Sequence, residues 1–329
     1  MHHNVPKVFA MSTELEALLH MVSELYRRPL VSCPPFERID IPALLLLAKN
    51  NGMEYYIAKK LATDYANKLS GGMLSAIRNF IKSYEDEYAR RFHVLEILNQ
   101  HFDDYLVIKT FHEYPKIRAD IDILVHDFDK ALKTLLRIGF HVIKYSNQKT
   151  LLLSTWGPKV HLHRKITWCD ENVSFIDNEL IWMNPRIITF GQVRFKIPNI
   201  NADFLTYLAH INFECFQITL SDMLLLYKLA SEVDWNVLLE QTNKHHWERT
   251  FKNSIKFIDM LHHTFYPQPC PFTKWNLKHH GMNNLKRISL PMPIPRQDMI
   301  LGIVERKLVK WAISHRTLRS IQLLLLKAK

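Results

Sequence analysis

The amino-acid sequence predicts an α+β fold in which a small mixed β-sheet lies between two helical parts. Before residue 105, apolar side chains recur three and four positions apart, as they do in amphipathic helices. The pattern then changes to short apolar runs rich in β-forming residues, and helical spacing returns after residue 200. The predicted divisions are an N-terminal helical region (1–104), a sheet core (105–200), a C-terminal helical region (201–290) and a basic C-terminal helix (291–329).

The individual elements follow from these patterns and from the residues that interrupt them. Cys33-Pro34-Pro35 separates the first two helical patterns, and Gly71-Gly72 separates the second from the third. The first part is predicted to form helices at 15–28, 41–62 and 73–102. The core is predicted to form strands at 105–109, 120–125, 140–145, 150–154, 159–168 and 192–198, with one helix at 127–139. Later helices are predicted at 202–216, 221–233, 235–244, 247–265 and 298–329.

Composition excludes several classes of protein. The chain has only 8 glycines among 329 residues, and neither GxGxxG nor GxxxxGK[ST] occurs, which excludes Rossmann and Walker phosphate loops. The four cysteines are widely spaced, so the sequence predicts neither a thiolate zinc site nor a disulfide framework. No uncharged apolar run approaches the ~20 residues of a membrane helix, and the N-terminus is too polar for a signal peptide. We therefore expect a cytoplasmic protein without a transmembrane segment.

The positive charge is concentrated near the C-terminus. The formal net charge is +11, and the segment from Lys274 onward contains 12 basic and 2 acidic residues, against 31 and 30 in the rest of the chain. A localised basic segment is typical of a surface that binds a polyanion, so we expect RNA contacts there. The alternative is that the apolar residues of this helix simply pack on the body. The predicted RNA-binding residues are Arg306, Lys307, Lys310, Arg316 and Arg319.

Paired histidines are a second recurring feature. They occur at 245–246, 262–263 and 279–280, on or near predicted helices. Adjacent helical residues cannot converge on one ion, so we expect these pairs to face solvent or a polyanion.

The sequence ADIDILVH contains a candidate metal site. Residues two apart on a strand point the same way, which places Asp120 and Asp122 on one face and the apolar residues on the other. Two carboxylates this close repel each other unless they share a cation, and Mg²⁺ prefers oxygen ligands. The alternative is a pair of aspartates on a solvated strand face.

The surroundings of this strand resemble the polymerase-beta-like nucleotidyltransferase superfamily, and more closely its branch of uncharacterised nucleotidyltransferases. The shared features are a lysine after the first strand, an arginine before the D-hydrophobic-D strand, a helix that ends in Gly, and a strand that ends in a Leu-His motif. They correspond here to Lys109, Arg118, Asp120-Ile-Asp122, Gly139 and His161-Leu162-His163. The resemblance covers about residues 40–265 and implies a nucleotidyltransferase-type sheet.

The resemblance also implies a reaction and a set of site residues. Asp120 and Asp122 would hold Mg²⁺ (or Mn²⁺) ions that bridge the phosphates of an NTP substrate, whose nucleotide is then transferred to an acceptor such as RNA or tRNA. His161 occupies the position of the family's third catalytic carboxylate. The residues expected to contact the nucleotide are Lys109, Thr110, Arg118 and His163.

The histidine at position 161 leaves alternatives open. A neutral imidazole favours Zn²⁺ or Mn²⁺ over Mg²⁺, so the ion could differ, or Glu171 or Asp177 could supply the third carboxylate. The site could also be catalytically inactive and serve only to bind nucleotide or RNA. A third hypothesis is metal-dependent phosphoester hydrolysis by His161 and His163. No protein partner is indicated by the sequence.

Overall fold

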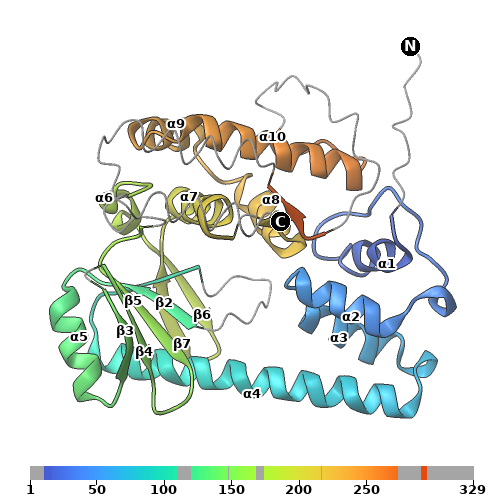
Figure 1. Ribbon diagram of the computed structural model, residues 1–329, viewed down its shortest axis with the longest axis horizontal. Coiled ribbons are helices and arrows are strands. Elements are labelled where there is room, and N and C mark those ends of the chain that lie inside the picture. The colour runs from blue at the N-terminus through green and yellow to red at the C-terminus, as the bar shows by residue number, and fades with distance from the viewer. Residues whose placement is uncertain are drawn as a thin grey trace.

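A computed structural model gives the fold of the chain and describes residues 11–109, 120–146, 148–167, 174–215, 217–272 and 290–294. The predicted α+β class is confirmed: one small mixed sheet lies among helices (Figure 1). Helix α4 runs beneath both the sheet and the N-terminal helices, and the later helices lie on the opposite side (Figure 1). The helices are α1 (Thr13–Met21), α2 (Ile41–Asn50), α3 (Glu54–Asp64), α4 (Gly71–His101), α5 (Phe128–Arg137), α6 (Asn178–Trp182), α7 (Ile200–His210), α8 (Leu220–Leu229), α9 (Trp235–Lys244) and α10 (Glu248–Phe265).

The main sheet has five strands in the order β1-β2-β5-β4-β3. Strands β2 and β5 are parallel, and every other neighbouring pair is antiparallel, so the sheet is mixed as predicted. A separate hairpin joins β6, which the sequence patterns missed, to β7. The strands are β1 (Leu106–Ile108), β2 (Asp120–Leu124), β3 (His141–Tyr145), β4 (Lys149–Leu153), β5 (Lys159–His163), β6 (Arg186–Phe190), β7 (Val193–Ile197), β8 (Gln217–Ile218) and β9 (Met292–Pro293).

The two faces of the sheet have opposite chemistry. Alternate residues of a strand point to opposite faces, and residues paired across strands share a face. On one face, Ile121, Ile123 and Leu162 are buried in a core that includes Val94, Leu95 and Leu98 of α4 and residues of α5. The other face contains the polar residues Asp120, Asp122, Lys149, His161 and His163, as the strand register requires. The sheet therefore gathers its polar groups on one side.

The helices differ from prediction in several places: α1 ends at Met21 rather than at residue 28, and the short helix α6 was not predicted. The single helix expected at 41–62 is two helices, because Gly52 adopts φ 66° between them, a conformation that ends a helix. Helix α7 continues into a π-helix, Ile211–Cys215, a form that often occurs at functional sites.

The expectation for His262 was wrong. Its exposed fraction is 0%, and its ring packs against Tyr26, Tyr227 and Tyr266. His263, the other member of the pair, has an exposed side chain. Position on a helix face relative to the core, rather than sequence pairing, decided which histidine is solvated.

The predicted basic C-terminal region, 291–329, is described at its first four residues. The segment 290–294 contributes β9, which pairs with β8, whereas the helix predicted at 298–329 lies outside the described residues. Within the described part of the chain, no helix has both the length and the apolar character that crossing a membrane would require.

Candidate functional site

A cavity of about 120 Å³ opens on the polar face of the sheet. Residues of strands β2, β4 and β5, Lys109 just after β1, and residues of the α7 region surround it. Its lining is Lys109, Asp120, Asp122, Lys149, His161, His163, Ile166, Thr167, His210 and Glu214. The sequence-predicted residues among the described ones therefore converge on a single space.

The pairing of β2 with β5 builds the centre of this site. Asp122 lies directly opposite His161 in the parallel register, and Asp120 is two residues earlier on the same face. The Nδ1 atom of His161 is 3.4 Å from Oδ2 of Asp120 and 3.5 Å from Oδ1 of Asp122. Asp120, Asp122 and His161 therefore lie on adjacent strands and face one cavity, as the roles implied by the resemblance require.

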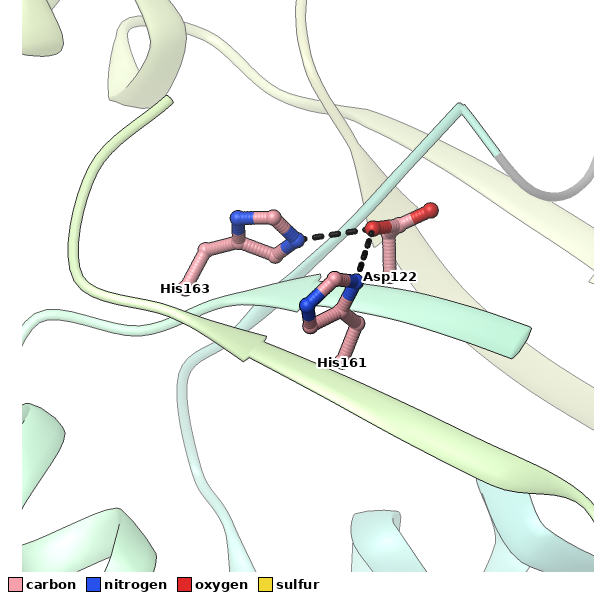
Figure 2. A group of neighbouring side chains, drawn as sticks. All are labelled: Asp122, His161 and His163. Carbon is pink, nitrogen blue, oxygen red and sulfur yellow. Dashed lines mark hydrogen bonds and ion pairs between the residues drawn. The ribbon is translucent and has the colours of Figure 1, made fainter. Parts of the chain in front are cut away.

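His163 orients Asp122 from within the sheet. Its exposed fraction is 4%, and its Nε2 atom donates a hydrogen bond of 2.7 Å to Oδ1 of Asp122. Figure 2 shows the rings of His161 and His163 both directed at this carboxylate oxygen. Burial lowers the pKa of His163 to about 4 despite the neighbouring carboxylate, so the imidazole is neutral near pH 7.

Asp122 is a buried anion with several compensating partners. It is only 3% exposed, and burial alone would raise its pKa. The Lys109 ammonium and the hydrogen bonds of His161 and His163 outweigh burial and hold the pKa of Asp122 well below its ordinary value. Asp122 therefore keeps its negative charge near pH 7.

His161 is the more accessible of the two histidines. Its side chain is 22% exposed. Burial lowers its pKa, but hydrogen bonds to Asp120 and Asp122 outweigh burial, so the net shift is upward. The two carboxylates thus favour a positively charged group at this position.

Lys109 brings a cation into the same space from the end of β1. The residue is 6% exposed, and its backbone has φ 59°, a left-handed conformation that is uncommon outside glycine. Its Nζ atom is 3.7 Å from Oδ1 of Asp122 and 3.9 Å from Oε2 of Glu214. The ammonium therefore lies between two carboxylates.

Three ionisable lining residues were not assigned a role from the sequence: Lys149, His210 and Glu214. The imidazole Nδ1 of His210 is hydrogen-bonded to Oε2 of Glu214. Burial opposes ionisation of Glu214, but His210 and Lys109 outweigh it and lower the pKa of Glu214 far below its ordinary value. The only available signal was the four-residue spacing of His210 and Glu214 in the predicted helix 202–216.

The other candidates for a third carboxylate lie elsewhere or outside the described residues. Asp177 is bonded to Gln241, Lys244 and His245 of the α9 region and does not line the cavity. Glu171, Thr110 and Arg118 lie outside the described residues, as do the predicted RNA-binding residues Arg306, Lys307, Lys310, Arg316 and Arg319.

Comparison with known families agrees with this arrangement. Residues 111–263 match the model of a family described as uncharacterised nucleotidyltransferase. This region of the chain belongs to that family. The nucleotidyltransferase region contains every lining residue of the cavity except Lys109. No curated protein matches the chain.

The nucleotidyltransferase region could hold a metal ion. Asp122, His161 and His163 each offer a ligand atom, and these atoms lie within 4.8 Å of one another. Carboxylate oxygen suits Mg²⁺ and Mn²⁺, whereas imidazole nitrogen suits Zn²⁺ and other transition metals. A mixed set of this kind fits one divalent ion, and it favours Mn²⁺ or Zn²⁺ over Mg²⁺.

Proposed function

We propose that the protein transfers a nucleotide from an NTP to an acceptor at the cavity formed by β1, β2, β4, β5 and the end of α7. The observation that carries this proposal is the convergence of Asp120, Asp122 and His161 inside the nucleotidyltransferase region. Two carboxylates that share a strand face, with an imidazole nitrogen 3.4 Å and 3.5 Å from their oxygens, form a donor set for a divalent ion.

The charged and histidine side chains of the sheet and of Lys109 take roles that their surroundings support. Asp120, Asp122 and His161 are the proposed ligands of one divalent ion, Mn²⁺ in preference to Mg²⁺, and His163 fixes the orientation of Asp122 through its hydrogen bond. His163 is thus assigned to positioning rather than to nucleotide contact, because it is almost fully buried. Lys109 and Lys149 face the NTP phosphates, with Thr110 and Arg118 as further predicted contacts.

The proposed reaction is an in-line displacement. The acceptor hydroxyl loses its proton to solvent, and its oxygen forms a bond to the α-phosphorus of the NTP. The bond between the α-phosphorus and the oxygen that bridges the α- and β-phosphates breaks, and pyrophosphate leaves with that oxygen. A bound divalent ion would stabilise the negative charge on the phosphate and lower the pKa of the attacking hydroxyl. The lysines keep the triphosphate in place by charge, and His163 holds the Asp122 carboxylate in one orientation.

RNA is the acceptor class that the sequence favours. The predicted basic helix at 298–329 supplies the charge that neutralises phosphates along a polynucleotide. We further propose that the reaction takes place in the reducing cytoplasm, in keeping with Cys33, Cys215 and Cys270, which are thiols rather than disulfides.

The proposal is tested by incubating the full chain with each α-labelled NTP, Mn²⁺ or Mg²⁺, and total RNA or protein. Wild type is expected to transfer label, and chelation of the metal is expected to abolish transfer. Asp122→Asn keeps the side-chain shape but removes the charge, so transfer should fall by roughly 100-fold or more. Asp86→Asn, a matched change on the exposed surface of α4, should leave transfer unchanged.

Other outcomes point to the rival functions. Release of phosphate from nucleotide without label on any acceptor would indicate a phosphohydrolase. Nucleotide binding without turnover, whatever the metal, would indicate an inactive binding module and would overturn the proposal.

A further inference from the structure

In the part of the chain that the structure describes, the carboxylates of the cavity are arranged for one metal ion rather than two. A two-metal site places its ions ~3.5–4 Å apart, and such a site needs shared carboxylates around both ions. Among the described lining residues, the carboxylates are Asp120, Asp122 and Glu214. His161 stands opposite Asp122, where the resemblance to the family implies a third carboxylate. The sheet therefore supplies two anionic side chains to the cavity instead of three.

Glu214, the remaining carboxylate of the cavity lining, already contacts other charged groups. It comes from the π-helix that follows α7, not from the sheet. Its Oε2 atom is hydrogen-bonded to Nδ1 of His210 and lies 3.9 Å from Nζ of Lys109. The contacts of Glu214 therefore place a lysine, rather than open space for an ion, between this residue and Asp122.

The Lys109 ammonium is fixed in position by the fold. The side chain is almost fully buried, and the backbone is held in a left-handed conformation at the end of β1. Such a conformation persists in a residue other than glycine only when the surroundings impose it. With Asp122 at 3.7 Å on one side and Glu214 at 3.9 Å on the other, the ammonium bridges the two carboxylates.

A second lysine adds to this charge. Lys149 is half-buried, lines the same cavity and lies opposite His163 in the β4–β5 register. Its charge contributes, after those of His210 and Lys109, to the lowered pKa of Glu214. Two ammonium groups carry the same total charge as one divalent ion.

We propose that the site binds a single divalent ion at Asp120, Asp122 and His161, and that Lys109 and Lys149 supply the positive charge that a second ion would otherwise provide. This inference rests on the proposed function, since it concerns how the same cavity binds the triphosphate. The consequence is an obligatory requirement for the lysines in nucleotide binding, which added metal does not replace.

The number of bound ions tests this directly, without turnover. Full-length protein is titrated with Mn²⁺, followed by electron paramagnetic resonance of the free ion, in the presence of whichever of the four non-hydrolysable NTP analogues wild type binds most tightly. We expect one ion per chain in the complex. Lys109→Met keeps an unbranched side chain without charge and should weaken analogue binding by roughly tenfold to 100-fold, at any Mn²⁺ concentration.

Because Lys109→Met could unfold the chain, the test also uses Lys149→Met in the cavity and Lys82→Met on the surface. Removing Lys109 leaves the buried Asp122 with fewer partners, so this variant is first checked for cooperative unfolding. Lys149→Met changes a less buried residue and should also weaken analogue binding, whereas Lys82→Met on the exposed surface of α4 should not.

Different results would contradict the proposed nucleotide transfer and the proposed single-ion site. Two ions per chain, or full analogue affinity in both cavity lysine variants, would overturn the single-ion proposal even if wild type transfers label. One ion per chain with lysine-dependent analogue binding would support it even if no transfer is detected. No bound ion would overturn both.

Discussion

At the scale of single residues, the site depends on a buried carboxylate that is stabilised from three directions. Asp122 contacts His161, His163 and Lys109, and these partners offset the cost of burying its charge. His161 is one position at which the chemistry of this chain departs from the resemblance to its family. An imidazole nitrogen stands beside Asp120 and Asp122 at the position where the resemblance implies an anionic carboxylate oxygen.

We predict that His161→Glu shifts the metal preference toward Mg²⁺. A carboxylate adds the oxygen ligand that Mg²⁺ prefers and removes the nitrogen ligand that suits transition metals. The ratio of Mg²⁺ to Mn²⁺ affinity, measured by calorimetry on the full chain, should rise by roughly tenfold, which corresponds to about 1.4 kcal/mol.

The matched control is His141→Glu, on the exposed strand β3. It makes the same substitution outside the cavity lining and should leave both affinities unchanged. An unchanged ratio in His161→Glu would remove His161 from the ligand set.

At the scale of elements, segments far apart in sequence meet around aromatic side chains, among them Tyr26 beyond the end of α1. His262 of α10 is hydrogen-bonded through Nε2 to the hydroxyl of Tyr26 at 2.9 Å, and its ring packs edge-on against Tyr227 of α8. Burial, with smaller contributions from His263 and Arg27, lowers the pKa of His262 to about 3. The contact between these helices therefore depends on a histidine that stays neutral.

We predict that this histidine makes the fold sensitive to acid. Its pKa in the folded chain is about 3, below the ordinary value of 6.5, so the unfolded chain takes up a proton first as pH falls. The contribution of neutral His262 to the free energy of unfolding is fully present above pH 6.5. It is lost as pH falls from 6.5 toward 3. Between about pH 7.5 and about pH 5, His262 should account for a loss of at most about 2 kcal/mol in the free energy of unfolding.

Urea unfolding at the two pH values measures this loss. His262→Phe keeps an aromatic ring but cannot bind a proton, so its stability should fall less than that of wild type over the same interval. His263→Phe changes the exposed neighbour and should retain the acid sensitivity of wild type. Equal losses in wild type and His262→Phe would show that His262 does not contribute.

At the scale of the whole molecule, charge divides the chain into two parts. The segment from Lys274 onward carries 12 basic and 2 acidic residues, while the rest of the chain is nearly balanced. The cavity, in contrast, collects carboxylates that are compensated locally by lysines and histidines. Long-range attraction of a polyanion is therefore expected from the C-terminal segment rather than from the cavity.

We predict that this segment sets the salt dependence of RNA binding. Neutralising Arg306, Lys307, Lys310, Arg316 and Arg319 together to Gln should weaken RNA binding and reduce the slope of log affinity against log salt by up to about 3.5. Filter binding across a salt series measures both quantities. Arg78→Gln with Lys82→Gln, on the exposed surface of α4, is the matched control.

Neutralisation is preferred to deletion because it keeps the apolar residues of the segment in place. Deleting residues 298–329 should also weaken binding and flatten its salt dependence. If the deletion instead unfolds the chain while the intact protein scarcely binds RNA, the positive charge is incidental.

The sequence by itself determined most of the helices and strands and two pairs of polar residues in the site. The period of two in Asp120-Ile-Asp122 placed both carboxylates on one face, and the run His161-Leu-His163 placed both imidazoles on one face. The boundaries of most strands followed from the same local patterns. These features were predictable because the alternation of polar and apolar residues in a strand, and their three- and four-residue spacing in a helix, involve residues only a few positions apart.

Only the tertiary structure decided which residues complete the cavity. The parallel register of β2 and β5 sets Asp122 opposite His161, about 40 positions later, and the end of α7 brings Glu214 within 3.9 Å of Lys109. The same packing buries His262 and leaves His263 exposed. Contacts between residues so far apart in the chain depend on how the sheet and helices pack, and local patterns in the sequence do not specify that packing.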